Sequence, residues 1–271
     1  MVYHGRMPVA YVTPSGNPAA GYLVQMRSLP NKKRKFVPQG DRLWLAPIDP
    51  ADWEKPDADL IFYNTMLIRP DGILAVTNGA QTDKGMKRGK PVLNFEHDFS
   101  CRYPEMTSRS IMHSWGYEPD SMSTPRVALV VSPTISDPSS CSYLFSTATR
   151  TEPVCDDDIG VIAHGFYYRD IIMERNGIGL PTYRSADGQA VSLSLYDDME
   201  FLGSLIRVPL TGETPEEIAQ SLFDFSDPSL IVASAGAVFR DDVWRIAHKN
   251  RFETLDEFEA YRSEVEVAQK K

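Results

Sequence analysis

Three polar residues stand where the sequence could support chemistry on a phosphate or a carbonyl group. Arg27 ends an apolar alternating run just before a turn, so its planar guanidinium could hold a phosphate or carboxylate through two hydrogen bonds. Tyr63 interrupts another apolar run and must face a core, an interface or a pocket. Glu118 lies in a loop stiffened by Pro119 and Pro125, where a buried carboxylate can act as a general base.

Each of these residues also has an ordinary structural interpretation. Arg27 precedes the basic run of residues 32–35, and such runs are common on solvated loops. Tyr63 could be a core tyrosine with a satisfied hydroxyl, and Glu118 could simply be exposed. The neighbouring Asn78-Gly79 pair and the Gly177-Ile178-Gly179 segment are typical of turns. The residue pattern alone leaves both interpretations open.

Other kinds of site are disfavoured by spacing. His97, His113 and His164 lack the i, i+4 or Cys-x-x-Cys spacing of zinc ligands, so we expect no metal site. The sequence contains no G-x-S-x-G nucleophile elbow, no Walker motif and no full dinucleotide fingerprint.

The elements that must position these residues are mostly strands. Turn residues at 14–17 and 70–72 separate apolar runs and predict antiparallel hairpins. Thr214 and Glu217, like Thr254 and Glu257, form capping boxes that predict two helix starts. Strands are predicted at 8–13, 20–27, 42–47, 59–69, 73–77, 127–132, 142–148, 160–168, 191–197, 203–210 and 230–239. Helices are predicted at 104–115, 168–175, 215–224 and 255–268. Two polar segments, 28–40 and 80–105, are predicted to be site-forming loops. This pattern favours an α+β fold in which helices cover antiparallel sheets.

Composition narrows the functional class. The 271 residues carry a net charge of -9, which disfavours binding to nucleic acid polymers or anionic membranes. No apolar run reaches the roughly 18 residues of a membrane span, and three cysteines without paired spacing fit a reducing compartment. We therefore expect a cytoplasmic protein.

Five segments, taken in order, resemble the archaeal-type IMP cyclohydrolase family. They are GRMPVAYVTPSG from residue 5, RSLPN at 27–31, YNTMLI at 63–68, NGAQTD at 78–83 and STPRVA at 123–128. The resemblance extends from about Tyr3 to about Tyr183, with an apparent insertion near 84–115.

The resemblance implies a four-layer αββα sandwich with antiparallel sheets, similar to that of N-terminal-nucleophile hydrolases. Because the chain begins Met1-Val2, we expect no self-cleavage to expose an N-terminal nucleophile. We expect residues 1–200 to form the cyclohydrolase-like domain and residues 201–271 a C-terminal extension packed on it.

The implied reaction is ring closure of a formamido-imidazole-carboxamide ribotide to IMP, with no cofactor and no metal. By position within the motifs, Arg27, Tyr63 and Glu118 would be catalytic, as cation, hydroxyl donor and base respectively. The implied substrate-binding residues are Asn31, Asn64, Asn78, Gln81, Asp83, Arg126 and Tyr183. The partner would be a small purine ribonucleotide, and a homo-oligomer of two or four subunits is consistent with the family.

Two alternatives remain open at this point. An amide hydrolase of the same layered fold would need an internal Cys or Ser nucleophile, for which no motif is present. A purine-nucleotide-binding protein without catalysis would bind the product and show no turnover.

Overall fold

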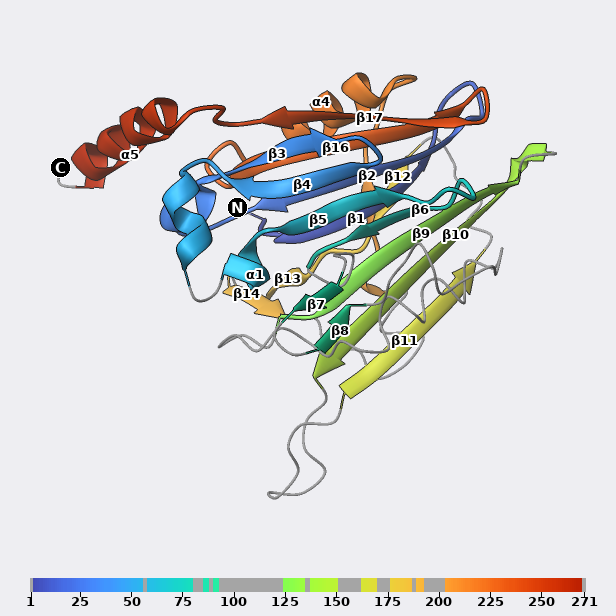
Figure 1. The fold of residues 1–271 in the computed structure, drawn as a ribbon, viewed down its shortest axis with the longest axis horizontal. Coiled ribbons are helices and arrows are strands. Elements are labelled where there is room, and N and C mark those ends of the chain that lie inside the picture. The colour runs from blue at the N-terminus through green and yellow to red at the C-terminus, as the bar shows by residue number, and fades with distance from the viewer. Residues whose placement is uncertain are drawn as a thin grey trace, which may run out of the picture.

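Alternating apolar strands build two antiparallel sheets that lie face to face in the computed structural model (Figure 1). The structure describes residues 2–55, 58–79, 85–87, 90–92, 124–134, 137–150, 162–169, 176–186, 189–192 and 203–269. The six-stranded sheet has the order β15 (Ile206–Val208), β12 (Gly177–Gly179), β1 (Arg6–Val12), β2 (Pro18–Gln25), β16 (Ile231–Arg240) and β17 (Val243–Asn250). The seven-stranded sheet has the order β11 (Ile162–Arg169), β10 (Asp137–Arg150), β9 (Arg126–Thr134), β6 (Leu74–Thr77), β5 (Tyr63–Ile68), β4 (Arg42–Pro47) and β3 (Arg34–Gln39).

Smaller elements complete the described chain. Two hairpins are formed by β7 (Gly85–Lys87) with β8 (Lys90–Val92) and by β13 (Tyr183–Ala186) with β14 (Gln189–Ser192). The helices are η1 (Pro30–Lys32), η2 (Pro50–Glu54), α1 (Ala58–Ile61), α4 (Pro215–Phe225) and α5 (Leu255–Gln269). Within the described ranges, no helix combines the length and apolar character required to cross a membrane.

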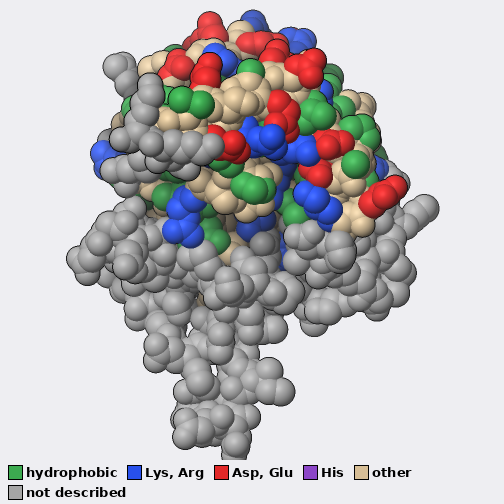
Figure 2. All heavy atoms as spheres, turned by 90° about the vertical axis from the view of Figure 1, so that its left-hand side faces the viewer, with side chains coloured by type: hydrophobic (Ala, Val, Ile, Leu, Met, Phe, Trp, Pro, Cys, Tyr) green, Lys and Arg blue, Asp and Glu red, His purple; other side chains and the backbone are tan. Residues whose placement is uncertain are grey.

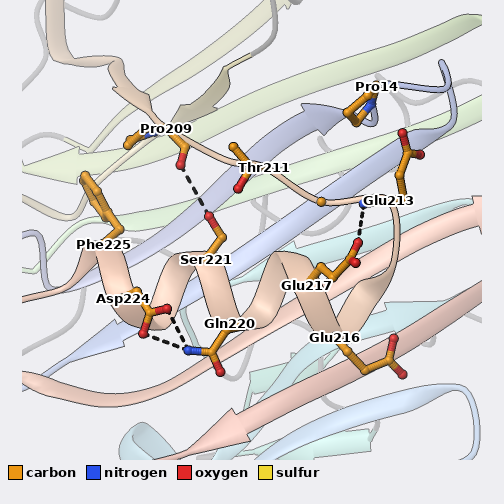
Figure 3. Close-up of a pocket in the computed structure, with 11 residues that line it drawn as sticks. Pro14, Pro209, Thr211, Glu213, Glu216, Glu217, Gln220, Ser221, Asp224 and Phe225 are labelled. Atoms are coloured by element: carbon orange, nitrogen blue, oxygen red, sulfur yellow. Dashed lines mark hydrogen bonds between the residues drawn. The ribbon is translucent and has the colours of Figure 1, made fainter.

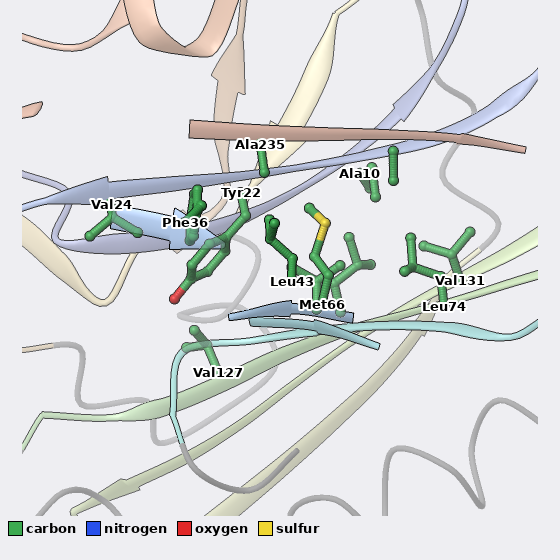
Figure 4. Packing of buried hydrophobic residues seen from close by; sticks show 14 of the residues in the cluster. Ala10, Tyr22, Val24, Phe36, Leu43, Met66, Leu74, Val127, Val131 and Ala235 are labelled. Carbon is green, nitrogen blue, oxygen red and sulfur yellow. The ribbon is translucent and has the colours of Figure 1, made fainter. Parts of the chain in front are cut away.

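The main core fills the space between the two sheets. Side chains alternate across a strand, so every second residue of each strand points into this space. Tyr22 and Ala235 enter it from the six-stranded sheet, and Met66 and Val127 enter it from the seven-stranded sheet (Figure 4). The other face of the seven-stranded sheet carries a second buried apolar cluster that includes Leu67.

Helix α4 covers the outer face of the six-stranded sheet. Its buried residues Ile218 and Leu222 face the sheet where Gly21 and Gly236 lie opposite each other in the β2–β16 ladder. The two glycines leave room for the helix to approach the strands closely. The helix begins with the expected capping box, since Thr214 accepts from the backbone N–H of Glu217 and the glutamate returns the bond.

Several sequence predictions are confirmed. The turns at 14–17 and 70–72 join β1 to β2 and β5 to β6 as antiparallel hairpins. Helices α4 and α5 begin where the capping boxes predicted. The α+β class with antiparallel sheets is also confirmed. The helix predicted at 104–115 lies outside the described residues.

Other predictions were wrong in part. The loop predicted at 28–40 contains strand β3, because its basic run hides an alternation in which Arg34 and Phe36 are buried and Lys35 is half-buried. The strand predicted at 59–69 begins only at Tyr63, after the short helix α1. The Gly177-Gly179 turn is the strand β12, paired with β1.

We expect Gly236→Ala to destabilise the fold by about 1–3 kcal/mol, because overpacking forces backbone shifts. A Cβ at this position would collide with the carbonyl of Pro215 and lie 2.8 Å from the Cβ of Ile218. The free energy of unfolding in urea measures the effect. Gly203→Ala is the matched control, since a Cβ there meets nothing within 4 Å. Equal stability of the two variants would contradict the close packing of α4.

Candidate active site

Strand alternation brings one arginine and two tyrosines together at one end of the space between the sheets. Arg6 shares its face of β1 with Ala10, Tyr22 comes from β2, and Tyr63 begins β5. The Nη1 of Arg6 donates to the Tyr63 hydroxyl at 3.4 Å. The hydroxyls of Tyr22 and Tyr63 lie 3.3 Å apart. Tyr63 is fully buried and Arg6 is 6% exposed, so these polar groups meet away from bulk water.

Arg6 also reaches the end of β6, an inner strand of the opposite sheet. Its Nη1 donates to the carbonyl of Asn78 at 2.8 Å. The Asn78 side chain extends the β6–β9 ladder, because its Nδ2 donates to the carbonyl of Pro125 at 2.7 Å and its Oδ1 accepts from Val127 N–H at 2.8 Å. The Asn78 amide therefore fixes the start of β9.

A stack of side chains connects this buried group to the surface. The Arg27 guanidinium lies 5.0 Å from the ring centroid of Tyr3. The Tyr3 ring stacks on that of Tyr183 at 5.2 Å, and the Tyr183 hydroxyl shares a hydrogen bond with Thr124 Oγ1. Gly5 has a φ of +70°, and a Cβ there would collide with the Tyr183 ring, so the stack requires glycine at this position.

Arginine charges act on the Tyr3 hydroxyl at this end of the molecule. Burial raises the pKa of the Tyr3 phenol, and the charges of Arg6, Arg27 and Arg34 oppose that rise. Three guanidiniums therefore act on one hydroxyl. Arg34 Nη2 also donates to Asn31 Oδ1 at 2.9 Å. Figure 2, which views this end of the molecule, shows Lys and Arg side chains across the middle of the face with Asp and Glu side chains beside them. The guanidiniums near Tyr3 are suited to a phosphate or another anion.

Two of the predicted residues point to the opposite face of the seven-stranded sheet. Asn64 pairs with Trp44 on β4, and alternation puts it on the face opposite that of Tyr63. Arg126 shares the phase of Ala128, which belongs to the outer apolar cluster. Both polar side chains are 1% exposed. The structure thus brings Arg27, Asn31, Tyr63, Asn78 and Tyr183 to one end of the sandwich and keeps Asn64 and Arg126 off its inner face.

Three predicted residues, Gln81, Asp83 and Glu118, lie outside the described residues. The role of Glu118 as the base therefore stays a prediction.

Strand β10 adds two hydroxyl groups. Thr147 and Thr149 continue the phase of Tyr143 and Phe145, whose side chains pack between the sheets. Thr147 pairs with Val127, at the same end as Tyr63. Both threonine hydroxyls are buried and have no hydrogen-bond partner in the described part of the protein. Buried polar groups are normally satisfied, so these two hydroxyls are candidates for contact with a bound molecule.

Sequence reasoning missed Tyr3, Arg6, Tyr22 and Arg34. A usable signal exists for Arg6, because it falls in the same alternating phase as Pro8 and Ala10 and therefore faces the core. Arg34 has the same relation to Phe36. A charged residue in the apolar phase of a strand is a candidate for a buried functional group.

A groove of about 870 Å³ lies elsewhere, along α4 (Figure 3). It is on the far side of the six-stranded sheet from the tyrosine and arginine cluster. Its lining includes the four carboxylates of Glu213, Glu216, Glu217 and Asp224. These charges repel a phosphorylated ligand. Among the described residues, no group of three His, Cys, Asp or Glu side chains is placed to hold a metal ion.

Comparison with known proteins gives consistent matches. A family model described as IMP cyclohydrolase-like protein matches residues 3–243. The chain is 26% identical over 253 residues to the IMP cyclohydrolase of Methanocella arvoryzae, covering 92% of this chain and 98% of that protein. It is 26% identical over 250 residues to the IMP cyclohydrolase of Methanocaldococcus jannaschii, covering 92% of this chain and all of that protein.

We expect Arg6→Lys to destabilise the protein by about 1–3 kcal/mol. A single ammonium cannot contact both the Tyr63 hydroxyl and the Asn78 carbonyl as the guanidinium does, so a buried acceptor is left unsatisfied. Urea denaturation measures the change. Arg207→Lys is the control, since Arg207 is exposed on the same sheet and should shift stability by less than about 0.5 kcal/mol. Wild-type stability in Arg6→Lys would rule out this anchoring role.

Proposed function

Because the chain belongs to the IMP cyclohydrolase-like family, we propose that it is an IMP cyclohydrolase, which closes the purine ring of 5-formamidoimidazole-4-carboxamide ribotide to give IMP. The observation that supports this most directly is the buried Tyr63 hydroxyl held by Arg6, with Arg27 and Arg34 at the same end of the sheet sandwich. A phenol donor beside an anion site matches a substrate that carries both a formyl oxygen and a phosphate.

The reaction is intramolecular, so the protein must chiefly orient the substrate and move protons. The carboxamide nitrogen attacks the formyl carbon and forms the new C–N bond, while its proton passes to a base. The formyl oxygen takes up a proton and becomes a hydroxyl. Its C–O bond then breaks as a second proton converts it to water, while the former formamide nitrogen loses its proton and forms the C=N bond of the new ring. Ideal orientation in such a reaction contributes up to about 7–11 kcal/mol of barrier lowering.

Tyr63 is the proposed donor to the formyl oxygen. Its hydroxyl oxygen accepts from Arg6, which leaves the phenolic proton free to point toward another acceptor. The Tyr22 hydroxyl oxygen lies 3.3 Å from that of Tyr63 and can accept its hydrogen bond when substrate is absent. The Arg6 charge also stabilises negative charge that develops on the phenol or the formyl oxygen.

Arg27 and Arg34 are the proposed contacts for the 5'-phosphate, with Asn31 orienting Arg34. Arg27 thus acts on the phosphate rather than on the reacting atoms. Tyr183 supports this end through its stack on Tyr3. The hydroxyls of Thr147 and Thr149, which have no hydrogen-bond partner among the described residues, are suited to the ribose or the imidazole carboxamide.

Glu118 remains the proposed base, and Gln81 and Asp83 remain proposed substrate contacts. Asn78 is proposed to act by positioning, since its amide holds the start of β9 and its carbonyl holds Arg6. For Asn64 and Arg126, burial on the opposite face favours a supporting role. Asn64 belongs to β5, which begins at Tyr63, and Arg126 belongs to β9, whose start Asn78 holds.

The finer fold is also a proposal. A four-layer αββα arrangement like that of N-terminal-nucleophile hydrolases is supported by α4 on one outer face and by the buried apolar cluster on the other, which requires a covering layer. We further propose that residues 1–200 and 201–271 form one catalytic unit, in which the C-terminal segment supplies β15, β16 and β17 of the six-stranded sheet and α4 on its outer face. We also propose that the protein acts as a cytoplasmic homo-oligomer.

Purified protein should convert the formamido ribotide to IMP, followed by ultraviolet absorbance. We expect Tyr63→Phe to lower kcat at least about 100-fold, because it removes the proton donor. Glu118→Gln should have an effect of similar size. Tyr143→Phe is the matched control: its hydroxyl is buried between the same sheets but donates to the carbonyl of Tyr11, so activity should be retained.

Absence of turnover above the buffer rate in the wild-type protein would reject the proposal. Binding of IMP in that case would identify a nucleotide-binding protein. Full activity in Tyr63→Phe would retain the reaction and remove Tyr63 as the donor.

A further inference from the structure

The C-terminal segment closes the edge of the sandwich beside the proposed phosphate site. Strands β3 and β17 are edge strands of opposite sheets. Asn250, the last residue of β17, bridges them: its Oδ1 accepts from Phe36 N–H at 2.7 Å, and its Nδ2 donates to the Phe36 carbonyl at 3.0 Å. Lys35 Nζ donates to the carbonyl of Glu253 at 2.6 Å. The chain that leads into α5 is therefore tied directly to β3.

A buried lysine joins the same segment to the loop before β3. We call residues 26–33, which include η1, the η1 loop. Lys32 in this loop is only 4% exposed. Its ammonium donates to the carbonyl of Ser229 and lies 5.6 Å from the ring centroid of Tyr261 on α5. A buried ammonium requires such partners, so the loop conformation depends on the C-terminal quarter of the chain.

Tyr261 is itself held in place by its neighbours. The Arg251 guanidinium lies 4.3 Å from the Tyr261 ring centroid, and the Phe252 ring packs against it at 5.2 Å. Phe252 and Phe258 form a small apolar cluster with Ile48, on which the first half of α5 rests. These contacts hold the Tyr261 ring in one orientation against the Lys32 ammonium.

The held loop carries the proposed anion contacts. Arg27 and Asn31 belong to the η1 loop, and Arg34 directly follows it and donates to Asn31. Figure 1 shows α5 at the end of the molecule where β3 and the N-terminus lie. The family model ends at residue 243, so α5 lies outside the matched region.

We propose that α5 is a positioning element, which acts through the contact of Tyr261 with Lys32 to hold the η1 loop in its phosphate-binding conformation. This inference rests on the proposed cyclohydrolase function for its kinetic consequence. Its structural consequence, order in the η1 loop, is independent of that function.

The kinetic test compares Tyr261→Ala with Tyr261→Phe. Loss of the ring should raise KM for the formamido ribotide about tenfold and leave kcat within about twofold, because Tyr63 is untouched. Inhibition by inorganic phosphate should weaken in parallel. Tyr261→Phe keeps the ring and should restore the wild-type KM. Val267→Ala is the control on the same helix, since Val267 is 56% exposed.

The second test needs no activity. Trypsin can cleave after the five basic residues at 27 and 32–35. We expect mass spectrometry to show faster cleavage there in Tyr261→Ala than in the wild-type, Tyr261→Phe and Val267→Ala proteins. Faster cleavage together with an inactive wild-type protein would reject the proposed function and retain the loop-holding role. An active wild-type protein whose KM and cleavage rate are unchanged by Tyr261→Ala would overturn the inference.

Discussion

The buried guanidinium of Arg6 is the contact on which the arrangement of the site depends. Apolar faces of two sheets attract each other without fixing a unique relative position, since hydrophobic burial is non-directional. A charge placed between them must be hydrogen-bonded, because an unsatisfied buried charge is strongly unfavourable. Arg6 on β1 is hydrogen-bonded across the space between the sheets to Tyr63 of β5 and to the carbonyl of Asn78, which directly follows β6. The same contact therefore fixes the sheets relative to each other and places the phenol.

A chain of contacts leads from Arg6 to the surface and positions each side chain along it. The Asn78 amide fixes the start of β9, and Thr124 just before β9 holds the Tyr183 hydroxyl. Tyr183 in turn supports Tyr3, over which Arg27 lies. Each step joins residues far apart in the sequence. A flexible surface arginine thereby acquires a defined position relative to a buried tyrosine.

Local signals in the sequence predicted the elements whose cause is local. Turn chemistry at 14–17 and 70–72 and the capping boxes at Thr214 and Thr254 act within a few residues, and the structure has them as predicted. Strand β3 was missed because Arg34 occupies an inward position where a strand pattern normally has an apolar residue. Its burial is possible because of Asn31, three residues earlier, and of Phe62, whose contact with Arg34 no short window of sequence reveals.

The sequence motifs also predicted more residues in one site than the strands allow, because neighbours in a motif were assigned to the same site. Neighbours in a strand point to opposite faces, so Tyr63 and Asn64 cannot both enter the space between the sheets. The same geometry separates Arg126 from Val127. Since these polar residues are nevertheless almost fully buried, their contribution to a site around Tyr63 must pass through the strands that they hold. The inner group of Arg6, Tyr22 and Tyr63, drawn from separate strands, is consequently a better description of the proposed reactive centre than any single segment of the sequence.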